Sequence, residues 1–535
     1  MPKLELLADE TLSKKLITKG FWSYFFAFLV APIGYILRML ISGSVSVSDI
    51  GIFYSILGLM GMISAYNDLG LTEAMQYFIP KFWIKGEKAK AKLVIYASFA
   101  MQLLTGILIF ILLYSGADWL AVHHFHDPVA AQIIKTLAFY FFGLNILTLC
   151  TTMFVSFQDT FSQGISNAIV QFCNLIFTII FRATASLTIQ NYAIVRITGV
   201  GIGCIASLII VWRKYKHVIL PNFLYKLFPA LDTKHPNHPE FGFDKISVLK
   251  EHFRYALRVF LVANVSTLLG NVDQQVIVNV LGAESAGFFS NFQSLLVVFT
   301  IVVAPLFNFL FPVTTELITK KETEKFGLLQ RIMYSYFGGF AVMIAGFFVV
   351  FGQEIAVFLF GESFRFSGYM LQRAAPCLIF NCWALISLNI LAGLGKIKAR
   401  LGVVSAALII NVILNFILLV LLHQGLIVST GILSVSRAVM ALGAMRVIAK
   451  DYPFSFDLRF LLKNLLLVGI LCILMYLLKT QNFGIFSSFS HTGSPRGELF
   501  LGLFCYFIIY GLILAFLNRT KIRLLLDEIK KIKGK

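Results

Sequence analysis

The chain has 535 residues, of which 58% are hydrophobic and only 13% are charged, and its mean hydropathy is +0.84. Soluble domains carry about 25% charged residues, so this composition excludes a soluble globular protein. The net charge is +19. A nucleic-acid-binding protein would concentrate its basic residues on one polar domain. Here they are spread over short segments between apolar runs, so nucleic acid is not an expected partner.

Apolar runs of about 20 residues, each long enough to cross the hydrocarbon core of a bilayer as a helix, recur along the whole chain. The runs are continuous, which excludes membrane-spanning β-strands with alternating polarity. We therefore predict an all-α polytopic membrane protein with about 14 transmembrane helices. The predicted spans are 21–43, 50–79, 93–114, 133–157, 165–186, 193–213, 256–280, 286–316, 328–351, 371–394, 402–422, 426–449, 463–479 and 497–517.

Residues 1–20 are amphipathic and lack the short apolar core of a signal peptide, so we expect a cytoplasmic segment lying on the membrane. With this end inside, most Lys and Arg residues fall in cytoplasmic segments and the outer loops hold few. This asymmetry is the positive-inside bias. It predicts a multi-pass protein of the cytoplasmic membrane with both termini in the cytoplasm, including a basic tail at 518–535.

The chain contains an internal repeat. The sequence SDIGIF at 48–53 leads into the second predicted helix, and ESAGFF at 284–289 leads into the eighth. Superposing Gly51 on Gly287 gives an offset of 236 residues (287 − 51). We predict two six-helix lobes, related as a parallel repeat by a pseudo-twofold axis along the membrane normal. Chance similarity between apolar sequences is the alternative interpretation. The predicted lobes are 21–213 and 253–449, joined by a proline-containing cytoplasmic linker at 214–252 and followed by two more helices in 450–517.

The opening helix, the turn at 48–53, and Asp68-Leu69-Gly70-Leu71 before Pro80 resemble the polysaccharide-exporter branch of the multidrug/oligosaccharidyl-lipid/polysaccharide (MOP) flippase superfamily. This branch includes the O-antigen flippases. Order, spacing and the repeat carry the resemblance, because no single motif is diagnostic. The resemblance implies two helical lobes that alternate between inward-open and outward-open forms. The implied substrates are polyprenyl-pyrophosphate sugars, moved to the outer leaflet. It implies no shared catalytic residues.

Charged residues inside the predicted spans are mostly basic. An ionisable side chain at mid-bilayer costs roughly 2.5–3.5 kcal/mol on insertion scales, so each needs a partner or a watery cavity. A pump for cations would favour carboxylates, whereas a pyrophosphate head is matched by guanidinium groups that bind its oxygens in pairs. We therefore hypothesise that four arginines line a cavity for this head, with structural pairing or interfacial snorkelling as the alternative for each. They are Arg38, Arg196, Arg373 and Arg437.

The helix predicted at 256–280 carries a polar stripe. Such a stripe turns toward protein or water rather than lipid. We predict that Asn271 and Gln275 in this stripe contact the substrate. Three acids are candidates for coupling transport to protons or sodium, namely Asp273 in the same helix and Asp68 and Glu73 on either side of Gly70. For the last two, helix packing or pairing with an arginine is an equally good interpretation.

The sequence shows no nucleophile–base pair, no nucleotide-binding loop in a suitable context and no metal-ligand spacing. We therefore expect no catalytic residues, no cofactor, no metal and no enzyme activity. We predict a flippase for polyprenyl-pyrophosphate-linked oligosaccharide, a precursor of surface polysaccharide or O-antigen. A lipid II flippase and a multidrug cation antiporter of the same superfamily are the alternatives. Expected partners are the lipid-linked oligosaccharide, membrane lipids, a polysaccharide polymerase and glycosyltransferases.

Overall fold

The computed structural model describes residues 12–219, 244–308, 310–480, 502 and 506–511. All regular elements within these ranges are helical, which confirms the predicted all-α fold. Among the described residues, ten helices are long and apolar enough to cross a membrane, or eleven if one bent pair is a single span. The predicted number of about 14 spans stays a prediction. The last one, 497–517, lies largely outside the described residues, and the spans predicted at 256–280 and 286–316 are not among the ten.

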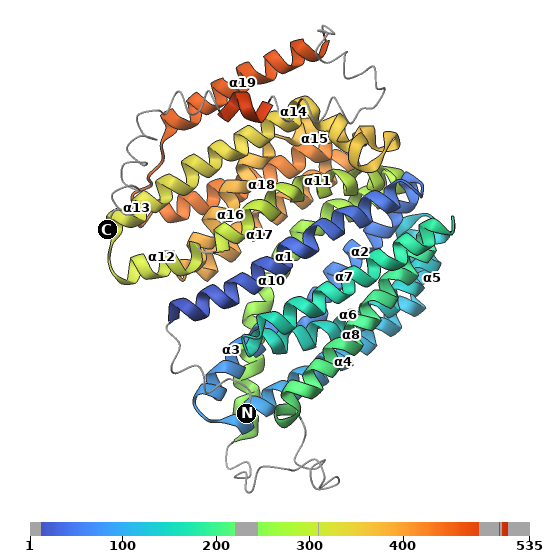
Figure 1. Cartoon of the computed structure of the whole chain (residues 1–535), viewed down its shortest axis with the longest axis vertical. Helices are drawn as coiled ribbons and strands as arrows, with labels where there is room; N and C mark the ends of the chain where they lie inside the picture. The colour runs from blue at the N-terminus through green and yellow to red at the C-terminus, as the bar shows by residue number, and fades with distance from the viewer. Residues whose placement is uncertain (1–11, 220–243, 309, 481–501, 503–505, 512–535) are drawn as a thin grey trace. The chain divides into compact units, whose positions relative to one another are not determined.

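The chain folds as two compact units, which divide in the sequence between Gly287 and Phe288. Figure 1 shows that long helices build each unit. The first unit contains α1 (Leu12–Ser42), α2 (Val47–Asp68), α3 (Leu71–Ile84), α4 (Lys88–Ser115), α5 (Ala117–Leu120), the π-helical turn η2 (Ala121–Phe125), α6 (Val129–Ser156), α7 (Thr160–Ala183), α8 (Ile189–Ile219) and α10 (Lys245–Val280).

The second unit contains most of α11 (Gly282–Asn308), whose first turns belong to the first unit. It continues with α12 (Leu310–Thr319), α13 (Thr323–Arg331), η4 (Ile332–Phe337), α14 (Gly338–Phe360), η5 (Glu362–Phe364), α15 (Arg365–Ala374), α16 (Cys377–Gly393), α17 (Ile397–Asn415), η6 (Phe416–Leu421), α18 (Val428–Ala449) and α19 (Leu458–Thr480). Helices α15 and α16 form the bent pair, with an angle of 65° between them.

The second predicted span, 50–79, is broken into α2 and α3. Leu69 and Gly70 adopt left-handed backbone conformations, with φ of 49° and 75°. Gly70 also lies against α10, where a Cβ atom would come within 2.9 Å of the backbone nitrogen of Phe260. Glycine alone combines this backbone conformation with so close an approach. The break thus places the side chains on either side of Gly70 beside α10.

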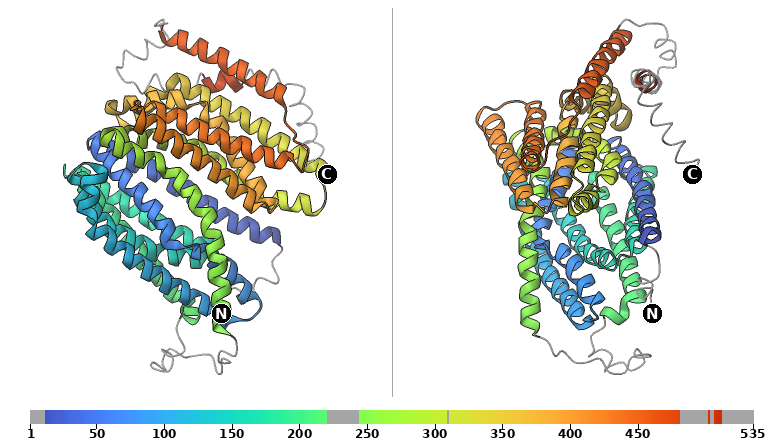
Figure 2. Two further views of the ribbon diagram at one scale, coloured as in Figure 1. Left: turned by 180° about the vertical axis from the view of Figure 1, so that it is seen from behind. Right: turned by 90° about the vertical axis from the view of Figure 1, so that its left-hand side faces the viewer.

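Helix α10 packs against α2 and α3 in the first unit, and Figure 2 shows it running alongside them. Two amides fix the contact with α2: Gln274 Nε2 donates to Ser55 Oγ at 2.7 Å, and Gln275 Nε2 donates to the Ser55 carbonyl at 2.8 Å. The sequence analysis assigned this helix to a lobe that starts at residue 253. The predicted boundary at residue 253 was drawn from the sequence repeat, whereas the contacts group α10 with the first unit. The lobe boundary stays a prediction.

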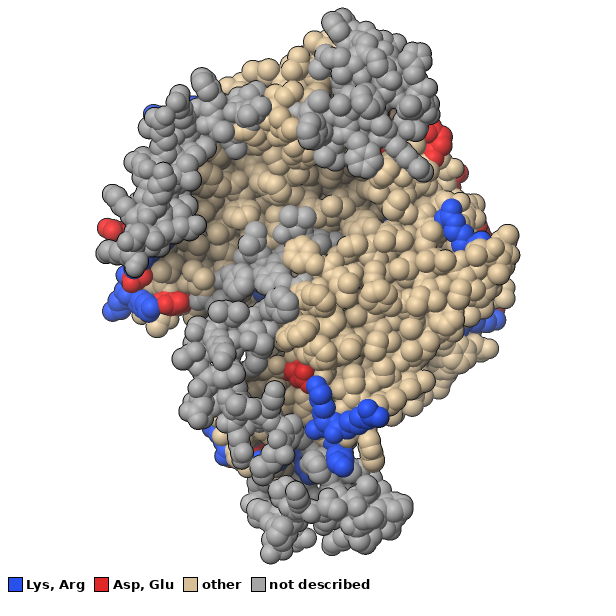
Figure 3. All heavy atoms as spheres, in the orientation of Figure 1, with Lys and Arg blue, Asp and Glu red and all other residues tan. Residues whose placement is uncertain are grey.

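The helices carry an apolar outer surface. Large side chains such as Leu104, Ile205 and Leu466 are more than 60% exposed. On the face that Figure 3 shows, the described surface is almost entirely uncharged and the charged atoms gather at its margins. An exposed apolar surface this extensive is unfavourable in water and matches the interior of a bilayer. The chain is a multi-pass membrane protein.

Candidate functional site

Arg38 is the first of the predicted arginines in the chain, on the transmembrane part of α1. Its side chain is half-buried, and its guanidinium carbon lies 3.9 Å from the ring centroid of Tyr54 on α2. At this distance the cation is attracted by the electron-rich ring face. Arg38 is therefore held against an aromatic ring from the neighbouring helix.

Arg196 lies on α8 and faces α6. Its Nη2 donates to the Tyr140 hydroxyl at 3.0 Å, and its guanidinium carbon is 5.2 Å from the centre of the same ring. Its Nε is buried and has no hydrogen-bond partner. A buried unpaired donor is costly, so this nitrogen is a vacant donor on a half-buried cation.

The structure brings Arg38 and Arg196 into one cluster. Tyr54 and Tyr192 lie close enough to both guanidinium groups to interact with each electrostatically. Tyr192 is fully buried one turn before Arg196. We call these two arginines with Tyr54, Tyr140 and Tyr192 the tyrosine–arginine cluster. No ion pair among the described residues involves Arg196. Neutral phenol groups thus surround the cations.

Arg437 belongs to the second unit, as the tenth of the 22 residues of α18. It is half-buried, and within the described ranges no hydrogen bond or ion pair reaches it. The preceding residue fixes the rotation of α18, because Ser436 Oγ accepts from Asn411 Nδ2 at 3.1 Å. Successive helical residues point about 100° apart. Arg437 therefore projects away from the contact that Ser436 makes with α17.

Arg373 lies near the end of α15, a helix that packs against α18. Its side chain is exposed, and its Nη2 donates to the Tyr369 hydroxyl at 2.7 Å. Both residues belong to the same helix, so this contact is local. Arg373 and Arg437 are thus on neighbouring helices of the second unit, while Arg38 and Arg196 are in the first.

Asp68 and Glu73 lie together at the break between α2 and α3. The Asp68 carboxylate accepts hydrogen bonds from the backbone N–H groups of Gly70 and Thr72, both at 3.1 Å, and from the Thr72 hydroxyl. It therefore caps the start of α3. Glu73 Oε2 is buried without a hydrogen-bond partner, and its carboxylate is close enough to Asp68 to interact with it.

The polar stripe of α10 faces other helices. Gln275 uses both amide atoms, since its Nε2 bonds Ser55 and its Oε1 lies 3.1 Å from His124 Nε2. Asn271 Nδ2 donates to the Thr267 carbonyl at 2.9 Å. Asp273 is also buried. Gln275 thus joins α10 to α2 and η2. The predicted roles of all three residues in substrate binding and coupling stay predictions.

The sequence analysis missed the tyrosines of the cluster. Tyr192 and Arg196 are four residues apart, which puts them on the same face of a helix, and this spacing was the available signal. Tyr54 and Tyr140 gave none, because each comes from another helix and meets an arginine only in the folded chain.

A model of the "Polysaccharide biosynthesis protein" family matches residues 16–318. The chain is also 23% identical over 421 residues to an uncharacterized membrane protein of Methanocaldococcus jannaschii. That alignment covers 74% of this chain and 77% of the relative.

Three solved structures resemble the fold. The lipid II flippase MurJ in an inward closed conformation has a TM-score of 0.66 at 14% identity, over 95% of this chain and all of that chain. An inward-facing MATE multidrug resistance transporter of the MOP superfamily has a TM-score of 0.64 at 14% identity, over 81% of this chain and 99% of that chain. A MOP superfamily transporter of Pyrococcus furiosus with a binding pocket of reverse polarity has a TM-score of 0.56 at 17% identity, over 82% of this chain and 96% of that chain. These likenesses confirm the predicted superfamily fold.

Proposed function

Because the chain belongs to the polysaccharide biosynthesis protein family, we propose that it is a flippase for polyprenyl-pyrophosphate-linked oligosaccharide. In this proposal it moves the lipid-linked sugar from the cytoplasmic to the outer leaflet of the cytoplasmic membrane by alternating access. Both termini face the cytoplasm, as the distribution of basic residues indicates. Glycosyltransferases then supply the substrate on one side, and a polymerase consumes it on the other.

The tyrosine–arginine cluster is the observation that carries this proposal. Two cations, Arg38 and Arg196, share the interior of the first unit with tyrosines. A guanidinium group binds phosphate oxygens in a bidentate arrangement that lysine cannot make. A positively charged drug would be repelled by the same groups. The cluster therefore favours a phosphate-bearing substrate over the cation of a multidrug antiporter.

The choice of tyrosine as the partner of Arg196 supports this interpretation further. A carboxylate beside Arg196 would neutralise the guanidinium charge and compete with an incoming phosphate. The Tyr140 hydroxyl orients the group through one neutral hydrogen bond. A charge-assisted bond to a phosphate is roughly twice as strong as a neutral one. Phosphate can thus bind the vacant Nε donor while the Tyr140 hydroxyl holds the guanidinium in place.

The second unit contributes a corresponding cation. Arg196 is the eighth residue of α8 and Arg437 the tenth of α18. These helices are the sixth of each predicted lobe, so both lobes carry an arginine on the corresponding helix. The two positions are 241 residues apart (437 − 196), five more than the repeat offset of 236. Arg373 lies on α15, next to α18, and is exposed, so it is a further candidate for binding the phosphate. We propose that both lobes provide guanidinium groups to the pyrophosphate head during transport.

We propose that an ion gradient supplies the energy for net transport and that the carboxylate pair Asp68 and Glu73 binds the coupling ion. Two adjacent carboxylates resist being ionised together, which favours binding a proton or a cation between them. Glu73 Oε2 is buried without a hydrogen-bond partner, and such an oxygen can accept either one. The pair lies at the break beside α10, where a change in charge can alter the packing of α3.

Transport in proteoliposomes tests the proposed substrate. A fluorescent polyprenyl-pyrophosphate oligosaccharide is the probe, and its accessibility to a membrane-impermeant quencher reports translocation. We expect Arg38→Gln/Arg196→Gln to lose most transport. The control Arg254→Gln/Lys398→Gln removes the same charge from two exposed positions and should keep it. Full transport by the cluster variant contradicts the proposal.

Two additional substrates separate the alternatives. Tetraphenylphosphonium, a lipophilic cation, should not be transported by the unaltered protein, and its transport would favour a multidrug antiporter. Lipid II tests the other alternative, because preference for lipid II over the oligosaccharide would assign the chain to peptidoglycan synthesis. Arg196→Lys keeps the charge and loses the bidentate geometry, so we expect it to retain only part of the activity.

A further inference from the structure

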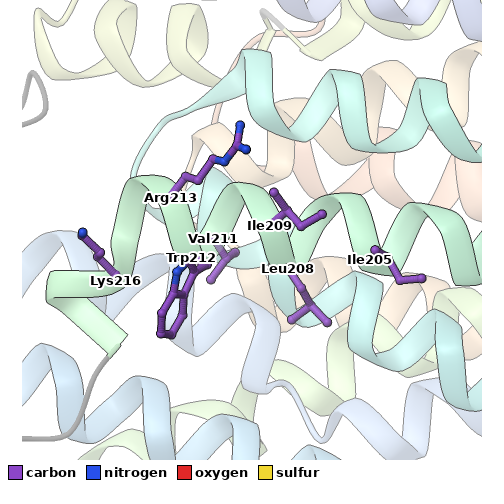
Figure 4. A pocket seen from close by; sticks show the side chains of 7 residues that line it. All are labelled: Ile205, Leu208, Ile209, Val211, Trp212, Arg213 and Lys216. Carbon is purple, nitrogen blue, oxygen red and sulfur yellow. The ribbon is translucent and has the colours of Figure 1, made fainter. Parts of the chain in front are cut away.

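A groove runs along the end of α8, with a volume of about 460 Å³. Its lining side chains are mostly aliphatic or aromatic, and Figure 4 shows them in a row along the helix with Lys216 at one end and Ile205 at the other. Ile205 is 61% exposed and Trp212 52% exposed, so the row is open to the membrane. The lining residues are Ile205, Leu208, Ile209, Val211, Trp212, Arg213 and Lys216.

The two basic residues of the groove follow its tryptophan. Arg213 is exposed, and the described part of the chain gives it neither a hydrogen bond nor an ion pair. The neighbouring Lys214 is already engaged, because its Nζ lies 2.9 Å from Asp159 Oδ2 and 2.6 Å from Ser162 Oγ. Tryptophan is typical of the boundary between hydrocarbon and headgroups. The groove is thus apolar at its Ile205 end and basic at its Lys216 end, and Trp212 places the basic end near the membrane surface.

The length of the groove matches one leaflet. Ile205 and Lys216 are 11 residues apart (216 − 205), which corresponds to about 16 Å along a helix. Half of the hydrocarbon core measures about 15 Å. A lipid with its headgroup at Lys216 would therefore extend its acyl chain as far as Ile205.

We propose that this groove is a binding site for an anionic glycerophospholipid. An acyl chain lies along the apolar side chains from Ile205 to Trp212, and the phosphate group contacts Arg213 and Lys216. With the orientation proposed above, this is the cytoplasmic leaflet, where basic residues attract anionic lipids. A lipid held here would anchor the last turns of α8, which ends at Ile219. The proposal does not depend on the transported substrate.

Quenching of Trp212 fluorescence by brominated lipid tests the site. The full-length protein is reconstituted in vesicles of phosphatidylcholine with a minor share of phosphatidylglycerol. In one sample the phosphatidylglycerol is brominated, and in the other an equal amount of the phosphatidylcholine is brominated. The difference between the unaltered protein and Trp212→Phe isolates the signal of this residue. We expect brominated phosphatidylglycerol to quench it preferentially, by up to about thirtyfold if both basic residues contribute fully.

Two double variants decide the outcome. Arg213→Gln/Lys216→Gln should abolish the preference for phosphatidylglycerol. Lys85→Gln/Lys398→Gln removes equal charge from exposed positions elsewhere and should preserve it. Equal quenching by both lipids, or a preference that survives in the first variant, overturns the proposal. Loss of the quenching when equimolar polyprenyl phosphate is added also overturns it, because the groove would then belong to the carrier lipid.

Discussion

Gly51 of α2 and Gly287 of α11 lie against each other, and a Cβ atom on Gly51 would come within 2.6 Å of the Gly287 nitrogen. The contact is reciprocal: Gly51 also meets the backbone of Ala283, and Gly287 meets the backbone of Val47. Both pairs share one offset, since 287 − 51 and 283 − 47 are each 236. Reciprocal contacts of this kind occur where a twofold axis relates two surfaces. The repeat is therefore present in the geometry as well as in the sequence.

Alanine at either glycine should destabilise the protein to a similar degree. The atoms that an added methyl group would meet belong to the backbone, so they cannot rotate away. Overpacking of this kind costs about 1–3 kcal/mol. We expect Gly51→Ala and Gly287→Ala each to lower the thermal unfolding temperature in detergent. The double variant should lower it by less than the sum, because both methyl groups disturb one contact.

Gly402→Ala is the matched control, since a Cβ atom there meets nothing within 4 Å. It lies inside α17, where alanine is a better helix former than glycine. Its unfolding temperature should be unchanged or slightly raised. A fall as large as that of Gly51→Ala would show that the two glycines have no special packing role.

The sequence predicted the repeat that relates these two glycines, but not their contact, which exists only in the folded chain. The stripe on α10 shows where such inference stops. Asn271 and Gln275 were predicted to contact the substrate because polar residues in a membrane helix avoid lipid. The same rule holds when they face another helix, and in the structure Gln275 bonds Ser55 and His124.

The tyrosine–arginine cluster shows a second limit. The arginines could be found from the sequence because a charge in an apolar run is conspicuous. Their partners could not, because Tyr54 and Tyr140 are ordinary residues of membrane helices and approach the arginines from α2 and α6 only after folding. The charge of the site was therefore predictable, but its tyrosine surroundings were not.

Tyr140→Phe tests whether Tyr140 is a positioning residue for Arg196. The variant keeps the ring and removes the hydroxyl that accepts from Nη2. A hydrogen bond to a charged group contributes about 1.5–3 kcal/mol, so the substrate concentration for half-maximal transport should rise by about tenfold. Transport kinetics in proteoliposomes measure this.

Tyr334→Phe is the control for Tyr140→Phe. It removes another buried hydroxyl, which lies 2.8 Å from Ser387 Oγ in the second unit. We expect it to lower thermal stability with little change in transport kinetics. Equal kinetic effects of the two substitutions would mean that Tyr140 acts only through stability.

The carboxylates at the break between α2 and α3 should separate into a coupling residue and a structural one. Glu73→Gln replaces an acid whose Oε2 has no hydrogen-bond partner, so the fold should be retained while stimulation by an ion gradient is lost. Asp68→Ala removes the acceptor of the N–H groups at the start of α3, which should cost about 0.5–2 kcal/mol of stability. Transport with and without an imposed proton or sodium gradient, together with thermal unfolding, distinguishes the two. Unaltered gradient dependence in Glu73→Gln would remove it as a coupling site.

Arg437 gives the sharpest contrast between stability and function. A guanidinium group near the middle of a span costs roughly 2.5–3.5 kcal/mol on insertion scales, and this one has no hydrogen bond or ion pair among the described residues. Arg437→Leu should therefore leave the unfolding temperature unchanged or raise it. If the side chain binds the phosphate of the substrate, the same variant should lose most transport.

Ser436→Ala should show the opposite pattern one residue away. Removing the hydroxyl leaves the buried amide of Asn411 without its acceptor, which costs about 1–3 kcal/mol. Thermal stability should fall, while transport per folded molecule is largely kept. Both variants are compared by unfolding in detergent and by flipping in proteoliposomes normalised to folded protein. A stability loss in Arg437→Leu would mean that the arginine has a structural role, which would count against its proposed role in binding phosphate.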